Sequence, residues 1–271
     1  MLAIYQFTRE LQNATCDAIV DSLTGRESHL MALNIASLKR ALQALVRKRA
    51  PIVFGDISRF EPASREFGLE RGTAIDRYYI DAFIAANADA IVGRALEVGE
   101  LRYLNRFGDR TSEKCVLAPA RAIVKDDPAL SRAVIGDLTD LTTLPIGAFD
   151  VFVCTQTLNF IFDVRGAIRG AHHVLAPGGT FVGTVAGISQ ISRYDMDRWG
   201  DFWRFTTLAM TKLIGEVFGS GNVRVEAWGN ALTAQMFLQG LAVEDVPNRA
   251  LLDRRDDDYQ LVIGFRARKV A

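Results

Sequence analysis

Three aspartates in a short aromatic run carry the most direct chemical signal in the sequence. Asp195, Asp197 and Asp201 alternate with aromatic residues between positions 194 and 205. A carboxylate can take the proton from a hydroxyl that must become a nucleophile. It also accepts hydrogen bonds from sugar hydroxyls, while aromatic rings cover the apolar face of the sugar. The run predicts a proton acceptor, first of all Asp195, beside a substrate surface formed by Tyr194, Trp199, Trp203 and Arg204. The alternative is a lid or loop whose aromatic side chains only pack.

Short polar stretches that follow apolar runs form a second group of candidates. Residues 97–100 (Glu-Val-Gly-Glu), 136–138 (Gly-Asp-Leu) and 155–156 (Thr-Gln) all have this placement. In an open α/β sheet, ligands bind beyond the carboxyl ends of the strands. Gly99 has no side chain, so the backbone there can approach a ligand closely. We therefore expect these stretches to meet around one ligand.

Seven apolar runs predict the strands that position these residues. Helical periodicity precedes the first run, over 75–86, and lies between later runs, over 164–175 and 208–218. Strands that alternate with helices predict an α/β fold, with a mostly parallel seven-stranded sheet and helices on both faces. The alternating residues 223–228 are typical of an edge strand. The expected strands cover 95–98, 115–117, 133–135, 151–154, 181–185, 223–228 and 259–265.

Residues 1–74 are expected to form an N-terminal helical extension and a connecting loop, ahead of a domain over 75–271. Apolar residues between positions 31 and 45 recur every three or four positions, which is typical of one helix face, and Pro51 ends this helix. The helix is expected to pack on the domain or on a second copy in a homodimer. The irregular residues 52–74 are a linker or a loop that folds over a site.

Charge and composition exclude several classes of protein. The 32 Lys and Arg residues balance the 32 Asp and Glu residues, so the basic excess of a nucleic-acid-binding protein is missing. No stretch approaches the roughly 20 apolar residues that span a bilayer, and the N-terminus does not resemble a secretory signal. Three scattered cysteines predict neither a disulfide framework nor a metal site. We expect a cytoplasmic protein without a membrane span or a nucleic-acid partner.

Four motifs in residues 75–271 give a resemblance to class I S-adenosylmethionine-dependent methyltransferases. They are Ala-Leu-Glu-Val-Gly at 95–99, Gly-Asp-Leu at 136–138, Phe-Asp-Val-Phe-Val-Cys at 149–154 and His-Val-Leu-Ala-Pro-Gly-Gly at 173–179. The run 192–206 also resembles a stretch in methyltransferases of bacterial polysaccharide and glycan gene clusters. The resemblance implies a Rossmann-like, doubly wound sheet. It also implies S-adenosylmethionine as cofactor and S-adenosylhomocysteine as product.

The resemblance further implies roles around the cofactor. Glu97 would serve the ammonium group of the methionine moiety. Asp137 would accept a hydrogen bond from the adenine amino group, and the Leu138 amide would donate to a ring nitrogen. Arg71 or Arg77 would pair with the methionine carboxylate. The implied cofactor-binding residues are Arg71, Tyr78, Glu97, Gly99, Glu100, Asp137, Leu138, Thr155 and Gln156.

The sequence departs from the family pattern at two places. The first motif has a single glycine, Gly99, where the family usually has three. The acidic residue that usually closes the second strand and binds the ribose hydroxyls aligns with Cys115, and the nearby carboxylate is Glu113. A metal cluster after Thr155 and a catalytic role for the His172-His173 pair are not expected.

These observations predict methyl transfer to an oxygen of a sugar or another small polar metabolite. Two alternatives stay open at this point. The chain could be a methyltransferase-like protein that no longer transfers methyl groups and acts as a binding or assembly partner. It could instead methylate a nitrogen or carbon of a secondary metabolite, where positioning replaces a base.

Overall fold

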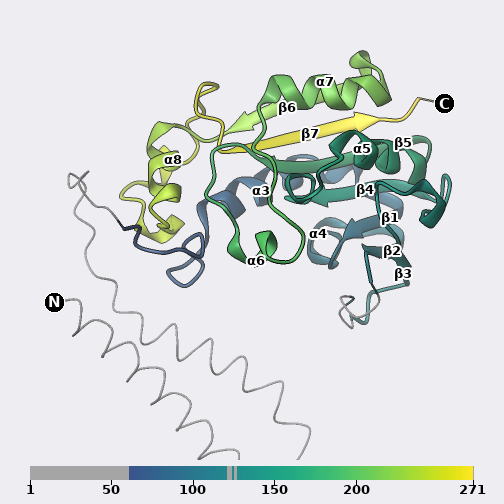
Figure 1. Cartoon of the computed structure of the whole chain (residues 1–271), viewed down its shortest axis with the longest axis horizontal. Helices are drawn as coiled ribbons and strands as arrows, with labels where there is room; N and C mark the ends of the chain where they lie inside the picture. Colours follow the sequence, from purple (N-terminus) through teal and green to yellow (C-terminus); the bar gives the residue numbers. More distant parts are fainter. Residues whose placement is uncertain (1–60, 121–123, 125–126, 271) are drawn as a thin grey trace, which may run out of the picture. The chain divides into compact units, whose positions relative to one another are not determined.

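One seven-stranded sheet, in the order β3-β2-β1-β4-β5-β7-β6, organises the computed structural model, which describes residues 61–120, 124 and 127–270 (Figure 1). β7 is antiparallel to β5 and β6, and the other neighbouring strands are parallel. The prediction of a mostly parallel seven-stranded sheet is confirmed, as is the edge position of residues 223–228. The strands are β1 (Val92–Val98), β2 (Arg110–Ala118), β3 (Arg132–Ile135), β4 (Phe149–Thr155), β5 (Leu175–Ala186), β6 (Val223–Trp228) and β7 (Val262–Arg268).

Helices connect most of the strands and begin at side chains that cap them. Asp163, Thr206 and Asn230 each accept a hydrogen bond from a backbone N–H of the first turn of α5, α7 and α8, which satisfies a donor that has no partner within the helix. The α-helices are α3 (Ile75–Ala86), α4 (Arg102–Phe107), α5 (Val164–Val174), α6 (Arg193–Met196), α7 (Thr207–Phe218) and α8 (Ala231–Leu238). The 3-10 helices are η1 (Ala88–Ala90), η3 (Leu141–Thr143), η4 (Leu158–Phe160), η5 (Ser220–Asn222), η6 (Val243–Asp245) and η7 (Arg249–Leu251).

The two faces of the sheet are covered by different helices. Successive side chains of a strand point to opposite faces, so Leu96 and Phe152 pack in one hydrophobic cluster with α5 and α7. Ala95 and Val151 pack in the other cluster with α3, α4 and α8. This two-sided burial explains why the central strands read as continuous apolar runs in the sequence.

Several boundaries differ from the sequence prediction. β2 begins five residues earlier than expected, at Arg110, because its amino-terminal half carries polar residues that pair with β1 but are not fully buried. β5 begins at Leu175, so Pro177 and Gly178 belong to this strand and do not form a separate break after the helix. β7 begins at Val262, three residues later than expected.

The segment before α3 packs on the same unit as the sheet. Ala63 N donates to Gln239 O at 2.8 Å, and residues 71–74 contact residues 242–245. The expected N-terminal helix and its part in a homodimer lie outside the described residues. Within the described ranges, no helix combines the length and apolar character that crossing a bilayer requires.

Candidate functional site

Two cavities lie at the carboxyl edge of the sheet. The β1–β2 cavity has a volume of about 270 Å³ and is lined by Gly99, Glu100, Leu101, Arg102, Asn105, Val116, Asp127 and Leu130. The β4–β5 cavity has a volume of about 240 Å³. Polar side chains in its lining are Asp76, Arg77, Thr155, Gln156, Asn159, Ser189, Gln190, Ser192, Asp195, Asp201 and Arg204. Both cavities therefore lie where an open α/β sheet binds ligands.

Gly99 gives the β1–β2 cavity its open floor. Its φ is +79°, a conformation that glycine adopts without strain, and a Cβ built there would meet no atom within 4 Å. The Tyr103 side chain is 1% exposed and packs in the core, so it leaves the cavity open. The single glycine of this motif thus provides the space that a ligand needs.

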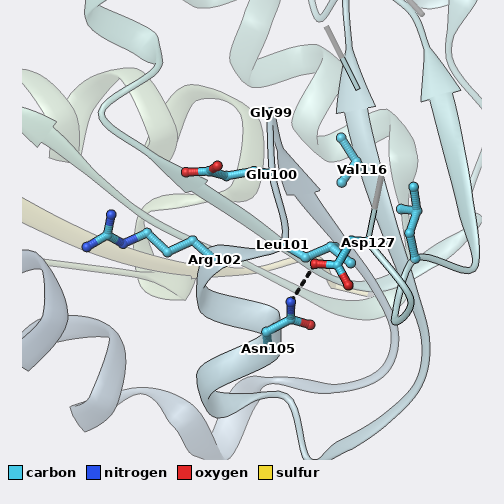
Figure 2. A pocket seen from close by; sticks show the side chains of 8 residues that line it. Gly99, Glu100, Leu101, Arg102, Asn105, Val116 and Asp127 are labelled. Carbon is cyan, nitrogen blue, oxygen red and sulfur yellow. Dashed lines mark hydrogen bonds between the residues drawn. The ribbon is translucent and has the colours of Figure 1, made fainter. Parts of the chain in front are cut away.

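Asp127 is a carboxylate of this cavity that the sequence analysis missed. Asn105 Nδ2 donates to Asp127 Oδ2 at 2.7 Å, which links α4 to the loop after β2 (Figure 2). Leu117 pairs with Val98 at the ends of β2 and β1, so the loop that follows reaches the space beside Gly99. A search for carboxylates beyond the end of the strand would have found Asp127.

The expected ribose acids lie elsewhere. Cys115 is in the middle of β2, because that strand continues to Ala118, and burial raises the pKa of its thiol to about 11. Glu113 accepts a hydrogen bond from Arg132 Nε at 2.9 Å near the amino-terminal half of the strand. Neither side chain lines a cavity, so the proposal of either as the ribose ligand is corrected.

Glu97 binds the start of α4 and does not face a ligand. Its oxygens accept hydrogen bonds from Tyr103 N at 3.0 and 3.1 Å and from Leu104 N at 2.9 Å. The side chain is 3% exposed, and this burial raises the pKa of the carboxyl to about 7 despite the two donors. In this structure the Glu97 carboxyl group therefore caps the start of α4.

Asp137 and Leu138, the residues expected to contact adenine, lie outside the linings of both cavities. Asp137 Oδ1 accepts hydrogen bonds from the backbone N–H and the hydroxyl of Thr139, at 2.8 and 2.9 Å. Leu138 is 4% exposed and packs with α5 in the core. Neither residue lines a cavity, because the turn after β3 is closed by its own hydrogen bonds.

The end of β4 forms the floor of the β4–β5 cavity, as predicted for Thr155 and Gln156. Gln156 has a φ of +50°, an unfavourable conformation for a residue with a side chain, and Gln156 N donates to Thr184 O at 2.8 Å. Strained backbone of this kind often occurs at functional sites. Asn159, three residues further in η4, lines the same cavity and was not singled out from the sequence.

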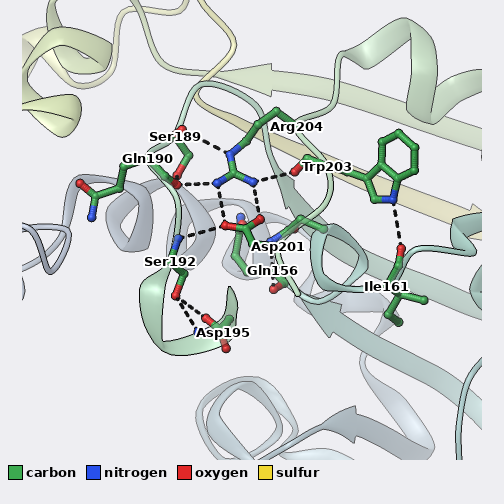
Figure 3. A network of polar contacts seen from close by, with 10 residues as sticks. Gln156, Ile161, Ser189, Gln190, Ser192, Asp195, Asp201, Trp203 and Arg204 are labelled. Atoms are coloured by element: carbon green, nitrogen blue, oxygen red, sulfur yellow. Dashed lines mark hydrogen bonds and ion pairs between the residues drawn. The ribbon is translucent and has the colours of Figure 1, made fainter. Parts of the chain in front are cut away.

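The three candidate carboxylates have different surroundings, and Figure 3 shows two of them, Asp195 and Asp201. Asp201 accepts hydrogen bonds from Arg204 at 2.6 and 2.9 Å and from Ser192 N at 3.0 Å. Burial would raise the pKa of Asp201, but these donors outweigh it and lower the pKa. Asp195 lines the cavity and accepts a hydrogen bond from Ser192 Oγ at 2.6 Å. Asp197 is exposed and lies outside both linings, so Asp195 is the carboxylate best placed to meet a ligand.

The aromatic residues of this segment pack outside the cavity. Trp203 Nε1 donates to Ile161 O at 3.1 Å, and the Trp203 ring stacks on Phe162 with ring centres 5.9 Å apart. Tyr194 and Trp199 are exposed and line neither cavity. Of the four expected substrate contacts, only Arg204 lies in the lining; Trp203 packs on Phe162, whereas Tyr194 and Trp199 are exposed to solvent.

The basic and aromatic candidates before β1 are bound to other parts of the chain. Arg71 forms a two-pronged ion pair with Asp245, at 2.9 and 3.1 Å. Tyr78 OH donates to Asp253 Oδ1 at 2.7 Å, which raises the pKa of the tyrosine to about 12. Neither lines a cavity. Arg77, the stated alternative to Arg71, does line the β4–β5 cavity.

Asp76, next to Arg77, is a second carboxylate that the sequence analysis missed. It lies in the first turn of α3, lines the β4–β5 cavity and accepts a hydrogen bond from Arg77 N at 2.7 Å. Burial raises the pKa of Asp76, although Arg77 opposes the shift. The sequence signal was that Asp76 directly precedes Arg77, itself a candidate ligand of the cofactor, at the start of a predicted helix.

Comparison with known proteins gives this arrangement a chemical context. Residues 109–183 match the sequence model of a family described as a methyltransferase domain. The match runs from β2 into β5 and includes three of the four sequence motifs in full, at 136–138, 149–154 and 173–179. It implies S-adenosylmethionine as the cofactor. No curated protein matches the chain in sequence.

Several solved structures have a similar backbone. An S-adenosylmethionine-dependent methyltransferase from Mesorhizobium loti is 19% identical, with a TM-score of 0.49 over 72% of this chain and 98% of that chain. The N-methyltransferase NodS from Bradyrhizobium japonicum is 14% identical, with a TM-score of 0.45 over 73% and 97%. The [4+2]-cyclase SpnF is 16% identical, with a TM-score of 0.49 over 88% and 93%.

Proposed function

We propose that the chain transfers the methyl group of S-adenosylmethionine to a hydroxyl oxygen of a sugar or another small polar metabolite. The observation that carries this proposal is the pair of cavities at one edge of the sheet, one beside Gly99 and one beside Gln156. The methyltransferase-domain match over residues 109–183 supports it. Bound S-adenosylmethionine supplies a methyl group on a positively charged sulfur.

The β1–β2 cavity suits the nucleoside part of the cofactor. The open position over Gly99 admits a group that a side chain would block. Asp127, held by Asn105, presents carboxylate oxygens to the same space, and such oxygens accept hydrogen bonds from vicinal hydroxyls. We assign the ribose to Asp127 and Glu100, in place of the acid that is missing at the end of β2.

The β4–β5 cavity suits the methyl-transfer end and the acceptor. Asp195 is the proton acceptor in this assignment, because Ser192 Oγ fixes one carboxylate oxygen and the residue lines the cavity. Gln156 and Asn159 position the acceptor through hydrogen bonds. Methyl transfer depends mainly on placing the acceptor oxygen in line with the sulfur and methyl carbon, and a base removes the proton that the hydroxyl loses.

Calorimetry and product analysis test the proposal in sequence. We expect S-adenosylmethionine and S-adenosylhomocysteine to bind, whereas ATP, another adenine nucleotide, does not compete. Mass spectrometry over a panel of nucleotide sugars and oligosaccharides then identifies the acceptor that gains one methyl group. If neither cofactor form binds at millimolar concentration, the enzyme assignment fails and a role as a non-catalytic binding partner replaces it.

A further inference from the structure

The charged groups of the β4–β5 cavity do not balance. Its lining contains three carboxylates and two guanidinium groups, so ionisation of all five leaves one negative charge. Asp201 and Arg204 neutralise each other through direct ion-pair contacts. The remaining groups are Asp76 and Arg77 of α3 and Asp195 of α6. The excess negative charge is therefore associated with Asp76 and Asp195, on two elements that both face the cavity.

A buried amide oxygen adds a further acceptor that the protein leaves unused. Asn159 is 3% exposed, and its Oδ1 has no hydrogen-bond partner within the part of the chain that the structure describes. Its Nδ2 donates to Gln156 O at 3.5 Å, which fixes the orientation of the amide. A buried polar atom without a partner is costly and signals a missing ligand or water. The charge excess favours a ligand that carries positive charge at this point, and the amide oxygen favours a ligand that also brings a hydrogen-bond donor into the cavity.

We infer that the β4–β5 cavity selects the cationic methyl donor over the neutral product, through the carboxylates of Asp76 and Asp195. This inference rests on the proposed function and adds a specific property to it. S-adenosylmethionine has a sulfonium that S-adenosylhomocysteine lacks, while the ammonium, carboxylate and nucleoside are the same in both. The difference in affinity between the two molecules therefore isolates the charge on sulfur.

The surroundings of Asp76 explain why a sulfonium would be preferred. Burial disfavours the ionised carboxylate and raises its pKa, so a nearby cation without acidic protons is a strong compensating partner. Arg77 supplies only part of this compensation. Transfer of the methyl group removes the sulfonium charge and with it the attraction, so the same two carboxylates would favour release of the product.

Binding measurements with three existing nucleosides test the inference. They are S-adenosylmethionine, S-adenosylhomocysteine and sinefungin, in which a carbon that carries a protonated amine replaces the methyl-bearing sulfur. From Coulomb attraction across a few ångströms at intermediate dielectric, we expect both cations to bind wild-type protein about tenfold more tightly than the neutral product. Asp76→Asn and Asp195→Asn should each reduce that ratio several-fold, with little change in affinity for S-adenosylhomocysteine.

Asp109→Asn is the matched control, because Asp109 is an exposed carboxylate directly before β2, at the amino end of the sheet. It should leave the ratio unchanged. Binding of S-adenosylhomocysteine by a variant verifies that the variant is folded. The comparison of sinefungin with S-adenosylhomocysteine uses wild-type protein, so it tests the inference even if a variant does not fold. Equal affinities for cationic and neutral nucleosides, or a ratio that survives both substitutions, would overturn the inference while leaving the methyltransferase proposal intact. Failure of all three nucleosides to bind would overturn both.

Discussion

The two cavities at the carboxyl edge of the sheet are built in different ways. Around the β1–β2 cavity, backbone and paired side chains dominate: Gly99 provides space, and Asp127 is held by Asn105. The β4–β5 cavity contains charged groups on several elements, including Asp76 and Asp195. A site for a nucleoside needs shape and a few hydrogen bonds, whereas a site for chemistry needs charges that respond to the reaction. In the proposed function, this contrast corresponds to a binding half at the β1–β2 cavity and a reacting half at the β4–β5 cavity.

The carboxylates near the two cavities differ in how many hydrogen-bond donors of the protein hold them, and therefore in how readily they can contact a ligand. Glu97 and Asp201 both have buried carboxyl groups, and both are held by donors of the protein itself. Asp195 is less buried and interacts with one hydroxyl in its own helical turn. Burial of a carboxyl group does not by itself indicate a catalytic acid, because the buried acids Glu97 and Asp201 stabilise the segments that shape the cavities.

The largest expected effect comes from removing the proposed base. Asp195→Asn keeps the shape and the hydrogen bond with Ser192 but cannot accept a proton. We expect turnover with the identified acceptor to fall about 100-fold or more, whereas affinity for S-adenosylhomocysteine stays within a few-fold. Asp197→Asn changes the same charge on the exposed side of the same segment and should alter turnover less than threefold. Equal losses in both variants would erase the distinction between cavity-facing and solvent-facing acids.

The second-largest expected effect is a change of folding stability with pH, caused by Glu97 at the end of β1. Burial raises the pKa of Glu97 to about 7 from an ordinary value of 4.5, so the folded protein keeps a proton that the unfolded chain has already lost. Stability should therefore fall as pH rises from about 4.5 to about 7, by at most about 3 kcal/mol. Above that range both states are ionised and the cost is constant.

Glu97→Gln removes this titration while keeping an acceptor for the start of α4. Urea unfolding at pH 5, 6, 7 and 8 should show a smaller pH dependence for the variant than for wild type. A wild-type stability that rises across this range would show that Glu97 is ionised in the folded protein throughout.

The third effect separates a structural acid from a reacting one. Asp201→Asn leaves Arg204, which is partly buried, without its ion pair, and hydrogen bonds to charged groups contribute about 2 kcal/mol. We expect a loss of stability of that order in thermal or urea unfolding, and a smaller loss of turnover than in Asp195→Asn at a temperature where both are folded. An Asp201→Asn variant that is stable but inactive would assign Asp201 to the chemistry.

The sequence predicted the sheet and some of the residues that line the two cavities, but it did not predict others. The strands were found because buried parallel strands are continuous apolar runs, and Gly99, Thr155 and Gln156 were found because they directly follow such runs. Asp127 was missed because it comes from a loop about ten residues after β2, whose position depends on tertiary packing. The hydrogen bonds within the turn after β3 were not predicted, because a motif gives residue types but not the contacts that close the turn.

Tertiary packing also decides the surroundings of Trp203 in the aromatic run. Rings that alternate with carboxylates have the composition of a sugar surface, and the same composition occurs in a loop that packs on a neighbouring aromatic residue. Trp203 stacks on Phe162, which is 41 residues earlier in the chain. No local pattern in the sequence indicates that partner, so only the fold distinguishes the two interpretations.

The smallest effect tests the space over Gly99. Gly99→Ala places a methyl group in the β1–β2 cavity and requires an unfavourable backbone conformation, since φ is +79°. Gly178→Ala is a close match, because φ there is +80° and the atom nearest to an added Cβ would be 3.9 Å away, outside both cavities. Both variants should lose about 1 kcal/mol of stability for the same backbone reason. Only Gly99→Ala should also weaken S-adenosylhomocysteine binding, about tenfold, by calorimetry. If both variants bind equally well, the nucleoside does not lie over Gly99, and the binding half of the site must be sought along another strand.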